Sequence, residues 1–331
     1  MSCAAFKLRF GIIGTNFISD WLLEGAAEDS RFEVAAIYSR SQDTANAFAV
    51  KHNIPYTFVS LDAMASSPLI DAVYIASPTA LHSEQAILFM EHGKHVLCEK
   101  PSASNIRELG RMIEAAKKYG VVFMEAMKST LMPGFGAILQ HLPEIGTVRR
   151  YFQYSSRYNK LKAGEVMNAF KPELSNGATM DLGIYTIYPL VVLWGRPFRI
   201  SATGILLSTG VDGQGAVNLE YGQGKNATIL YSKIADSSLP SEIQGEDGTI
   251  VIDKIQSPDR ILLKHRNGMS QDISIVGRKN EYYYEVKEFI DLVQSGSRES
   301  SVNSHMNSFI ALEVIDEIRR QLGVIYPADK N

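Results

Sequence analysis

The sequence predicts an α/β fold that begins with a doubly wound parallel sheet and continues into an α+β domain on a mostly antiparallel, open sheet. In residues 1–127 apolar strands alternate with amphipathic helices, which indicates βαβ units. In residues 128–331 strands follow strands across turn signals such as Asp212-Gly213, which indicates antiparallel pairing. The 331 residues also exceed the size of one ordinary core. We therefore expect two domains, 1–127 and 128–331.

The first domain is expected to contain strands that are nearly all apolar, because helices cover both faces of such a sheet. Gly93 and Gly120 each follow a helical stretch, at the position where a left-handed residue ends a helix. The expected strands are 7–13, 32–38, 71–76, 95–98 and 121–124, and the expected helices are 17–28, 43–52, 81–92 and 102–119.

The second domain is expected to consist mainly of short strands with few helices between them. Strands 200–207 and 227–231 carry apolar residues at alternating positions that could point outward, and an exposed apolar sheet face would need a partner. A two-fold dimer, or a tetramer built from it, is the commonest closed solution. The alternative is that the C-terminal helices cover this face. The expected strands are 147–157, 198–208, 215–221, 226–234, 241–245, 249–252 and 260–264, and the expected helices are 180–193, 281–295 and 304–322.

The composition excludes several classes of protein. A hydrophobic content of 45% and a charged content of 21% are typical of a soluble globular protein. A net charge of −3, without a basic run, argues against nucleic-acid binding. We find no apolar run of membrane-spanning length and no secretion signal at the N-terminus. Cys3 and Cys98 do not suggest a disulfide framework, and Cys98 is expected to be a small buried residue. A cytoplasmic location is therefore expected.

A strand, the turn Gly14-x-Asn16-x-x-Ser19 and a helix follow one another near the start of the chain, in the layout of a dinucleotide-binding turn. Only the first of the usual glycines is present, with an extra Gly11 in the strand. Asn16 is the best substitute for the second glycine because asparagine tolerates a left-handed backbone, and Ser19 is small enough for close helix–strand packing. An ordinary strand-to-helix turn is the alternative. The uninterrupted βαβ series that follows favours a Rossmann domain that binds a nicotinamide dinucleotide.

The residues after the second strand bear on the choice of cofactor. NAD-binding proteins usually place an acidic residue there to hold the ribose hydroxyls. This chain places Tyr38-Ser39-Arg40 at that point, and a guanidinium beside a hydroxyl suits a 2′-phosphate. The pattern favours NADP(H) over NAD(H), with a solvated surface arginine at position 40 as the alternative.

Five motifs are spread over most of the chain: Gly-Ile-Ile-Gly at 11–14, Ser-Pro-Thr-Ala-Leu-His at 77–82, Glu-Lys-Pro at 99–101, Glu-Ala-Met at 125–127 and Asp-Leu-Gly-Ile-Tyr at 181–185. With these motifs the chain resembles the glucose-fructose oxidoreductase, inositol dehydrogenase and rhizopine catabolism family, nearly end to end. The resemblance implies an NAD(P)-dependent oxidoreductase with a carbohydrate-like substrate, and a dimer in which the sheets of two second domains pack together.

The resemblance also implies roles for single residues. Lys100 would lie beside the nicotinamide and the substrate hydroxyl, Glu99 would contact the cofactor ribose, and Asp181 and Tyr185 match the second-domain motif. Many family members have histidine where this chain has Tyr185, and in having tyrosine there the chain resembles the dimeric dihydrodiol dehydrogenases and glucose-fructose oxidoreductase. The family's usual aromatic-Arg pair is replaced here by Ser-Thr at 129–130, which leaves the substrate open. The residues expected to bind the cofactor are Gly11, Gly14, Thr15, Asn16, Phe17, Ile18, Ser39, Arg40, Ser77, Pro78, Thr79, Leu81, His82, Glu99, Lys100 and Met127.

Hydride transfer at a C–OH or C=O centre requires that a proton also move on the oxygen of that carbon. Free tyrosine, with a pKa of about 10, is a poor base near neutrality, but a neighbouring ammonium favours the phenolate. We therefore predict Lys100 and Tyr185 as a proton-transfer pair, with Asp181 orienting the lysine or the substrate hydroxyl. Lys100 follows a parallel strand at its carboxyl end, where open α/β sheets bind ligands.

Each candidate also has a plainer interpretation. Tyr185 could be a core aromatic residue, and Asp181 could be a carboxylate favoured by a helix N-terminus. His82 could contact the cofactor or pack in the first turn of a helix. Arg157 and Lys171 could bind substrate hydroxyls or be solvated charges. The seven histidines show no metal-ligand spacing, so we predict no catalytic metal.

Three functions are compatible with these observations. The leading one is an NAD(P)-dependent oxidoreductase of a sugar, polyol or vicinal diol. The second is a cofactor-binding regulator or sensor of the same fold, which the reduced glycine turn favours and the intact 99–101 and 181–185 motifs oppose. The third is a nicotinamide enzyme for a non-sugar carbonyl or imine. In each, the expected partner is a small molecule rather than a nucleic acid or a membrane.

Overall fold

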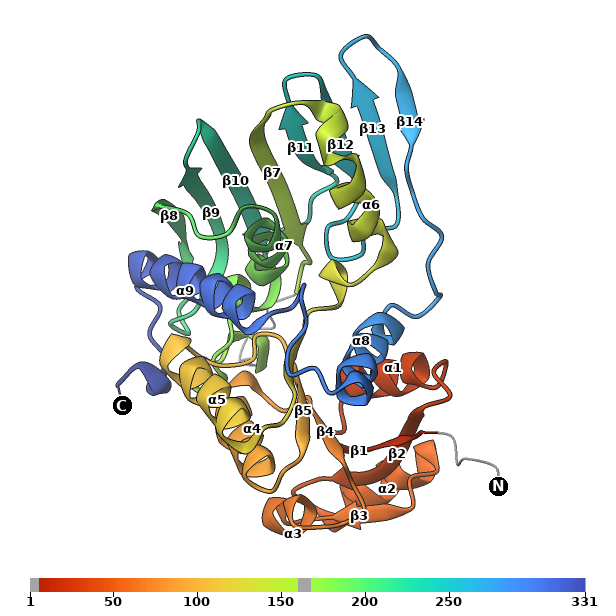
Figure 1. The fold of residues 1–331 in the computed structure, drawn as a ribbon. Helices are drawn as coiled ribbons and strands as arrows, with labels where there is room; N and C mark the ends of the chain where they lie inside the picture. Colours follow the sequence, from red (N-terminus) through yellow and green to blue (C-terminus); the bar gives the residue numbers. More distant parts are fainter. Residues whose placement is uncertain (1–5, 160–167, 331) are drawn as a thin grey trace. The chain divides into compact units, whose positions relative to one another are not determined.

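The computed structural model describes residues 6–159 and 168–330, so Cys3 lies outside the described residues (Figure 1). The chain divides into two compact units, each of which is described by itself. The first comprises the described parts of Met1–Ala103, Arg107–Met127 and Arg278–His305, and the second those of Ser104–Ile106, Lys128–Gly277 and Met306–Asn331. The segment Arg278–His305, which the sequence assigned to the second domain, thus belongs to the first unit.

The first unit contains a six-stranded sheet in the order β3-β2-β1-β4-β5-β6, with all neighbouring strands parallel. The strand order reverses between β1 and β4, and ligands of doubly wound sheets bind at such a switch point. The predicted parallel sheet is confirmed. The strands are β1 (Leu8–Ile13), β2 (Phe32–Tyr38), β3 (Tyr56–Phe58), β4 (Ala72–Ile75), β5 (His95–Glu99) and β6 (Phe123–Ala126).

Helices connect these strands, and one further helix joins the unit from the C-terminal part of the chain. The connecting helices are α1 (Phe17–Ala26), α2 (Gln42–His52), α3 (Leu61–Ala65), α4 (His82–Glu91) and α5 (Ile106–Tyr119). The further helix, α8 (Tyr282–Ser295), packs against α1. The guanidinium of Arg31 lies 2.6 Å from Asp29 and 2.7 Å from Asp291 of α8. This helix is therefore part of the first unit and is held there by α1 and Arg31.

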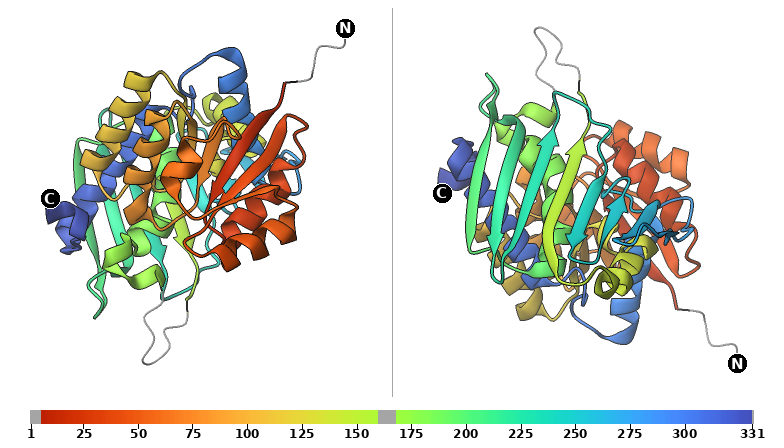
Figure 2. Two further views of the ribbon diagram at one scale, coloured as in Figure 1. Left: turned by 90° about the horizontal axis from the view of Figure 1, so that it is seen from below. Right: turned by 90° about the horizontal axis from the view of Figure 1, so that it is seen from above.

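The second unit contains an eight-stranded sheet in the order β14-β13-β12-β11-β7-β10-β9-β8 (Figure 2). Neighbouring strands are antiparallel except β7 and β10, which are parallel. The predicted mostly antiparallel sheet is confirmed. The strands are β7 (Val148–Ser156), β8 (Arg199–Leu206), β9 (Asp212–Tyr221), β10 (Lys225–Ser232), β11 (Ser241–Gly245), β12 (Gly248–Ile252), β13 (Ile261–His265) and β14 (Ser270–Asp272), and the helices are α6 (Pro133–His141), α7 (Ile184–Trp194) and α9 (His305–Leu322).

The two faces of this sheet differ in burial. In β10 the side chains of Ala227, Ile229 and Tyr231 are buried on the face where α7 packs, whereas Thr228 and Leu230 point to the other face and are half-buried. The expectation that the apolar residues of 227–231 point outward is therefore wrong for the three odd-numbered positions. Alternation along the strand turns these residues toward α7.

One helical stretch in the described part of the chain, Pro172–Trp194, is long and apolar enough to cross a membrane by length and composition. The sequence analysis expected no such run. The structure buries 72% of its most apolar window inside the protein. Its apolar side chains are those of a core helix that packs on β7 and β10.

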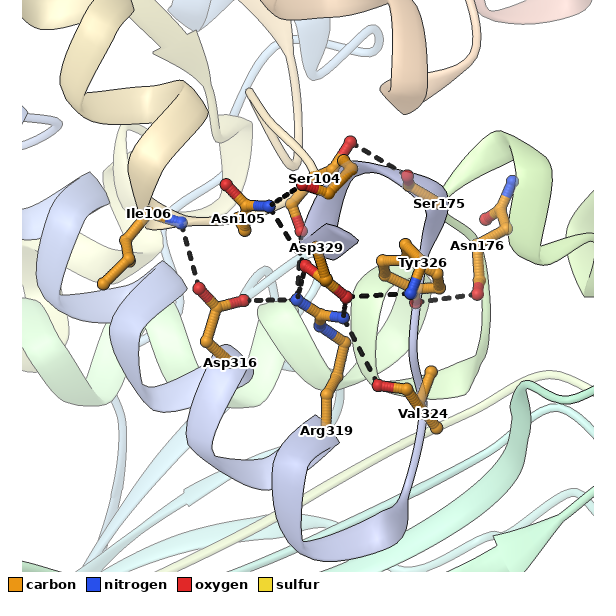
Figure 3. A network of polar contacts seen from close by, with 11 residues as sticks. Ser104, Asn105, Ile106, Ser175, Asn176, Asp316, Arg319, Val324, Tyr326 and Asp329 are labelled. Carbon is orange, nitrogen blue, oxygen red and sulfur yellow. Dashed lines mark hydrogen bonds and ion pairs between the residues drawn. The ribbon is translucent and has the colours of Figure 1, made fainter. Parts of the chain in front are cut away.

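A buried polar network holds the C-terminal end of α9 to residues 104–106 (Figure 3). The Arg319 side chain is 4% exposed and pairs with Asp316 at 2.7 Å and with Asp329 at 2.8 Å. Its guanidinium also donates to the backbone oxygen of Ser104, and Asp316 accepts a hydrogen bond from the backbone N–H of Ile106. The network therefore ties the segment that follows the Glu-Lys-Pro motif to the second unit.

Candidate cofactor and substrate sites

Side-chain hydrogen bonds stabilise the turn after β1. Gly14 has φ +112°, and a Cβ there would meet the backbone oxygen of Ala76 at 2.7 Å, so glycine is required. Asn16 is the N-cap of α1: its Oδ1 accepts from the backbone N–H groups of Ile18 and Ser19, and its Nδ2 donates to the Ala76 oxygen. The hydroxyl of Ser19, which is fully buried, donates to the oxygen of Gly14 at 2.8 Å.

Asn16 therefore has a different role from the one expected. Its backbone is extended, with φ −92° and ψ 175°, and not left-handed. Asparagine is present because it is among the best helix N-caps, and only Gly14 supplies the positive φ. Gly11 lies within β1, where a side chain would collide with Met64. The tight turn before a capped helix, at the sheet's switch point, fits the pyrophosphate of a dinucleotide.

Ser39 and Arg40 follow the end of β2. The backbone N–H of Ser39 donates to the oxygen of Phe58, which continues the pairing of β2 with β3. Arg40 is exposed and precedes Ser41, the N-cap of α2. Arg40 thus follows the carboxyl end of the strand next to β1, the region where the adenosine ribose binds in doubly wound sheets.

The loop after β4 is joined to the Glu-Lys-Pro loop by His82. One ring nitrogen of His82 lies 2.8 Å from the oxygen of Ser77, and the other lies 2.9 Å from the oxygen of Pro101. The ring is 1% exposed, and burial lowers its pKa. In the same loop the side chain of Leu81 is exposed and that of Thr79 is buried.

Glu99 is the last residue of β5 and Lys100 follows it, and both are half-buried. The carboxylate of Glu99 accepts a hydrogen bond from the hydroxyl of Tyr74 at 2.5 Å and another from the backbone N–H of Lys100 at 3.2 Å. Tyr74 is fully buried, and burial together with the nearby Glu99 raises its pKa well above the usual value. Tyr74 therefore stays a phenol that donates to Glu99, a role that sequence analysis missed.

The residues next to this strand end are buried. Cys98 is fully buried, as predicted, and burial raises the pKa of its thiol. Glu125 accepts a hydrogen bond from the backbone N–H of Ser102, which holds the loop after Lys100. Met127 is also fully buried, and its backbone oxygen accepts from Asn303 at 3.0 Å.

In the second unit, Asp181 lies on a π-helical turn, Thr179–Gly183, that leads directly into α7. Such single π turns are frequent at functional sites. The Asp181 carboxylate pairs with the ammonium of Lys233 at 2.8 Å and with the guanidinium of Arg157 at 3.4 Å. Lys233 is fully buried, whereas Arg157 is exposed. Arg157 was a candidate from the sequence for binding substrate hydroxyls, whereas Lys233 was not among the candidates.

The two cations meet because β7 and β10 are parallel. Ser156 pairs with Ser232, and the backbone N–H of Arg157 donates to the Ser232 oxygen. Arg157 and Lys233 thus follow directly on the carboxyl ends of two adjacent parallel strands. Both continue the odd-numbered face that is buried along these strands.

A second acidic residue, Asp212, lies close enough to Lys233 to interact with it electrostatically. Asp212 is fully buried and accepts hydrogen bonds from the backbone N–H and the hydroxyl of Thr179, both at 2.7 Å. Burial raises the pKa of Asp212, although the bonds from Thr179 oppose this. The Thr179 hydroxyl also lies 2.7 Å from the hydroxyl of Tyr231. Asp212 therefore fixes the first turn of the helix that carries Asp181.

Tyr185 lies in the first turn of α7 and is half-buried. It follows Asp181 by four residues, a spacing that makes side chains neighbours on a helix. Lys171 precedes the short 3-10 helix Pro172–Leu174. Ser129 and Thr130, which replace the family's aromatic-Arg pair, are buried in the 3-10 helix Lys128–Thr130.

The predicted site residues therefore form two groups. In the first unit Glu99 and Lys100 lie on one loop, which His82 joins to the loop that begins at Ser77. In the second unit Asp181 is held by Arg157 and Lys233. The pairing of Lys100 with Tyr185 stays a prediction. Among the described residues, no three His, Cys, Asp or Glu side chains gather in a way that could hold a metal ion.

Both parts of the chain match known family models. A model described as the oxidoreductase family with an NAD-binding Rossmann fold matches residues 8–127. A model described as the GFO/IDH/MocA C-terminal domain matches residues 143–251.

Named relatives are similar over nearly the whole chain. The scyllo-inositol 2-dehydrogenase (NADP(+)) IolU of Bacillus subtilis strain 168 is 52% identical over 327 residues, 98% of this chain and 99% of the relative. The trans-1,2-dihydrobenzene-1,2-diol dehydrogenase of Danio rerio is 33% identical over 97% of this chain and 99% of the relative. A solved 3-ketoreductase from Actinomadura kijaniata, in complex with NADP and TDP-benzene, has a TM-score of 0.84 at 22% identity, covering 97% of this chain and 99% of the other. This last similarity concerns the fold alone.

Proposed function

Because the chain belongs to the GFO/IDH/MocA family of oxidoreductases, we propose that it oxidises a ring hydroxyl of a cyclic polyol of the inositol type, with NADP(H) as its cofactor. As an NAD(P)-dependent oxidoreductase of a sugar or polyol it converts a CH–OH group to a ketone, or the reverse. The single observation that carries the finer proposal is the 52% identity over 98% of the chain to a scyllo-inositol 2-dehydrogenase.

The second unit supports a neutral, hydroxyl-rich substrate. Asp181 is paired with two cations of the protein, so it does not require a cationic group in the substrate. An ionised carboxylate accepts hydrogen bonds only, and a vicinal diol offers two O–H donors to it. The arrangement thus suits a polyol.

The first unit supports NADP(H). Arg40 lies exposed after β2, next to Ser39, and no carboxylate occupies the positions 38–40. A guanidinium can bind a phosphate in a bidentate manner, whereas a ribose diol would call for an acidic residue there. The relative named above is NADP-dependent by its name.

The chemistry divides between the cofactor and the chain. A bound nicotinamide would supply the hydride acceptor for the carbon that carries the hydroxyl. The O–H proton must then pass to the protein, and we assign this transfer to the Lys100 and Tyr185 pair. Glu99, which is fixed by Tyr74 and by the backbone N–H of Lys100, is the residue to which we assign the hydrogen bond from a ribose hydroxyl.

A turnover assay tests the substrate and the cofactor together. Scyllo-inositol, other inositols, aldoses and a vicinal dihydrodiol would each be offered with NADP+ and with NAD+, and the reduced cofactor would be followed by its absorbance. We expect the highest kcat/KM for an inositol with NADP+. Turnover of the aldoses alone, or of none of these compounds, would contradict the proposal.

Replacing Arg40 tests the reading of the 2′-phosphate. Arg40→Ala should weaken NADP(H) binding about tenfold to hundredfold, because a hydrogen bond to a charged group contributes about 1.5–3 kcal/mol. NAD(H) binding should change little. Equal weakening of both cofactors in a fluorescence titration would show that Arg40 does not bind the phosphate.

Replacing Lys100 and Tyr185 tests the proton-transfer pair. Lys100→Met and Tyr185→Phe should each lower turnover by about 10²–10⁴-fold, the usual contribution of a positioned acid or base. Circular dichroism would check that both variants fold. Rates close to the wild-type rate in both would remove the pair from the mechanism.

We also propose a homodimer, or a tetramer built from it, in the cytoplasm. The outward side of the eight-stranded sheet carries Leu230 and Tyr154, both half-buried, and Ile205, which is 48% exposed. An apolar sheet face of this kind is ordinarily covered by a second copy. The proposal would be refuted if light scattering at micromolar concentration showed a monomer and this monomer were fully active.

A further inference from the structure

The strongest feature that the sequence motifs do not account for is the lysine at the end of β10. The Lys233 side chain is fully buried, and its ammonium lies 2.8 Å from the Asp181 carboxylate. It also donates to the backbone oxygen of Ala169 at 3.3 Å and lies over the ring of Phe170. A lysine is almost never fully buried unless it is paired, so this placement has a specific cause.

We propose that Lys233 is a positioning residue for the reaction, because its buried ammonium fixes the Asp181 carboxylate in the orientation that receives a substrate hydroxyl. This inference rests on the proposed function and adds to it the residue that orients Asp181. Asp181 keeps 23% of its side chain exposed, and the ammonium of Lys233 lies against its Oδ2 atom.

The arrangement of the backbone makes this role specific to Lys233. Its backbone N–H donates to the oxygen of Gly213 in β9, and its carbonyl accepts from the backbone N–H of Asn159, which follows β7. Arg157 approaches the same carboxylate but is 58% exposed and 3.4 Å away, so solvent screens it. The buried ammonium is therefore the stronger constraint on Asp181.

The alternative is a purely structural role, in which Lys233 only balances buried charge. Asp212, also buried, lies near enough to interact with Lys233 electrostatically. Under this alternative, loss of the ammonium would lower stability and would affect activity equally whether or not position 181 carries a carboxylate. A double-mutant cycle separates the two roles.

The experiment compares the full-length wild type with Lys233→Met, Asp181→Asn and the double variant. The readouts are kcat and KM for the best inositol with NADP+, the NADPH dissociation constant and the thermal midpoint. We expect Lys233→Met to lower kcat/KM about 10- to 100-fold, the scale of a lost charge-assisted hydrogen bond. In the Asp181→Asn background the same change should lower it less than about twofold. NADPH binding should be unchanged in all variants.

Lys94 offers a matched control in the first unit. It is a partly buried lysine whose ammonium donates to the backbone oxygens of Ser67 and Ile70 at 2.8 and 2.9 Å. Lys94→Met should lower the thermal midpoint without changing kcat/KM. Where Lys233→Met does not fold, Lys233→Gln, which keeps a donor and most of the volume, replaces it in the same cycle.

Two outcomes would overturn the inference: an unchanged kcat/KM in Lys233→Met, or an equal loss in both backgrounds. A wild type that turns over no polyol would instead overturn the proposed function. The cycle would then be measured on the thermal midpoint. If the falls in thermal midpoint caused by replacing Lys233 and Asp181 were strictly additive, the interaction between these two side chains would itself be refuted.

Discussion

Replacement of Arg319 by methionine should destabilise the second unit strongly. Arg319 is 4% exposed and pairs with two carboxylates, Asp316 and Asp329, which are 20% and 24% exposed. Burial alone would lower the pKa of Arg319, but its bonds to these carboxylates raise it above the ordinary value, so it stays charged. Methionine would fill much of the space but would leave both carboxylates without their counter-charge.

The magnitude follows from the burial of the pair. Breaking a buried ion pair by removing one partner costs about 3–5 kcal/mol. The partly exposed carboxylates can regain some water, which favours the lower end of this range. For a unit of this size about 3 kcal/mol corresponds to a fall of about 6–12 °C in the thermal midpoint.

Arg320→Met is the matched control, because Arg320 is the next residue in α9 and its ion pair with Glu317 is exposed. We expect no resolved change in its thermal midpoint. Differential scanning calorimetry of the full chain gives the midpoints. Hydrogen exchange should show faster exchange at 104–106 in Arg319→Met alone. Midpoints within about 2 °C of each other would refute the reasoning.

Three further changes test the first unit. Gly14→Ala should weaken NADP(H) binding at least about tenfold, because its φ is +112° and a Cβ would meet a backbone oxygen; an unchanged affinity in a titration would contradict this. The pKa of Asp29 is lowered mainly by the hydrogen bond from Arg31, so this stabilisation is present above about pH 4 and is lost as the pH falls through the lower, folded-state value. In urea unfolding the stability difference between wild type and Arg31→Met should therefore narrow below about pH 4, and a constant difference would count against it. Tyr74→Phe should weaken NADP(H) binding several-fold through Glu99, about the value of one hydrogen bond, and should have no effect when Glu99 is already replaced by Ala.

The fold could be predicted from periodicity because strands and helices repeat with different periods. The six-stranded sheet differs from the expectation mainly by β3 and α3, which have three and five residues and are too short to show a period. The Asp212-Gly213 pair was interpreted as a turn, yet β9 begins at Asp212. Its carboxylate accepts hydrogen bonds from Thr179, 33 residues earlier, and no local pattern shows such a partner.

The position of the turn between β1 and α1 was predicted correctly, but the reason for asparagine at position 16 was not. Asparagine at position 16 has two physical reasons to occur at such a turn, a left-handed backbone or an N-cap. The sequence does not separate them, because both place the residue just before a helix. The structure shows the N-cap, and the oxygen of Ala76, from the end of β4, binds the other end of the same side chain.

The residues that surround Asp181 could not be predicted from the sequence, for a different reason. Arg157 and Lys233 are 76 residues apart, and they become neighbours only because β7 and β10 are the parallel pair in an otherwise antiparallel sheet. A weaker signal was present: Lys233 is in phase with Ala227, Ile229 and Tyr231, the buried face of its strand. A lysine in phase with a buried face must be paired, because an isolated buried charge is unstable.

This pairing also bears on how the site can act. A fully buried ammonium is stabilised by a nearby carboxylate, so Lys233 favours the ionised form of Asp181. An ionised carboxylate has no proton to donate and can only accept hydrogen bonds. In the mechanism that we propose, Asp181 would therefore orient a hydroxyl and would not act as the acid of the reaction. This is consistent with our proposal that the proton moves through Tyr185, which is half-buried and lies one turn later on the same helix.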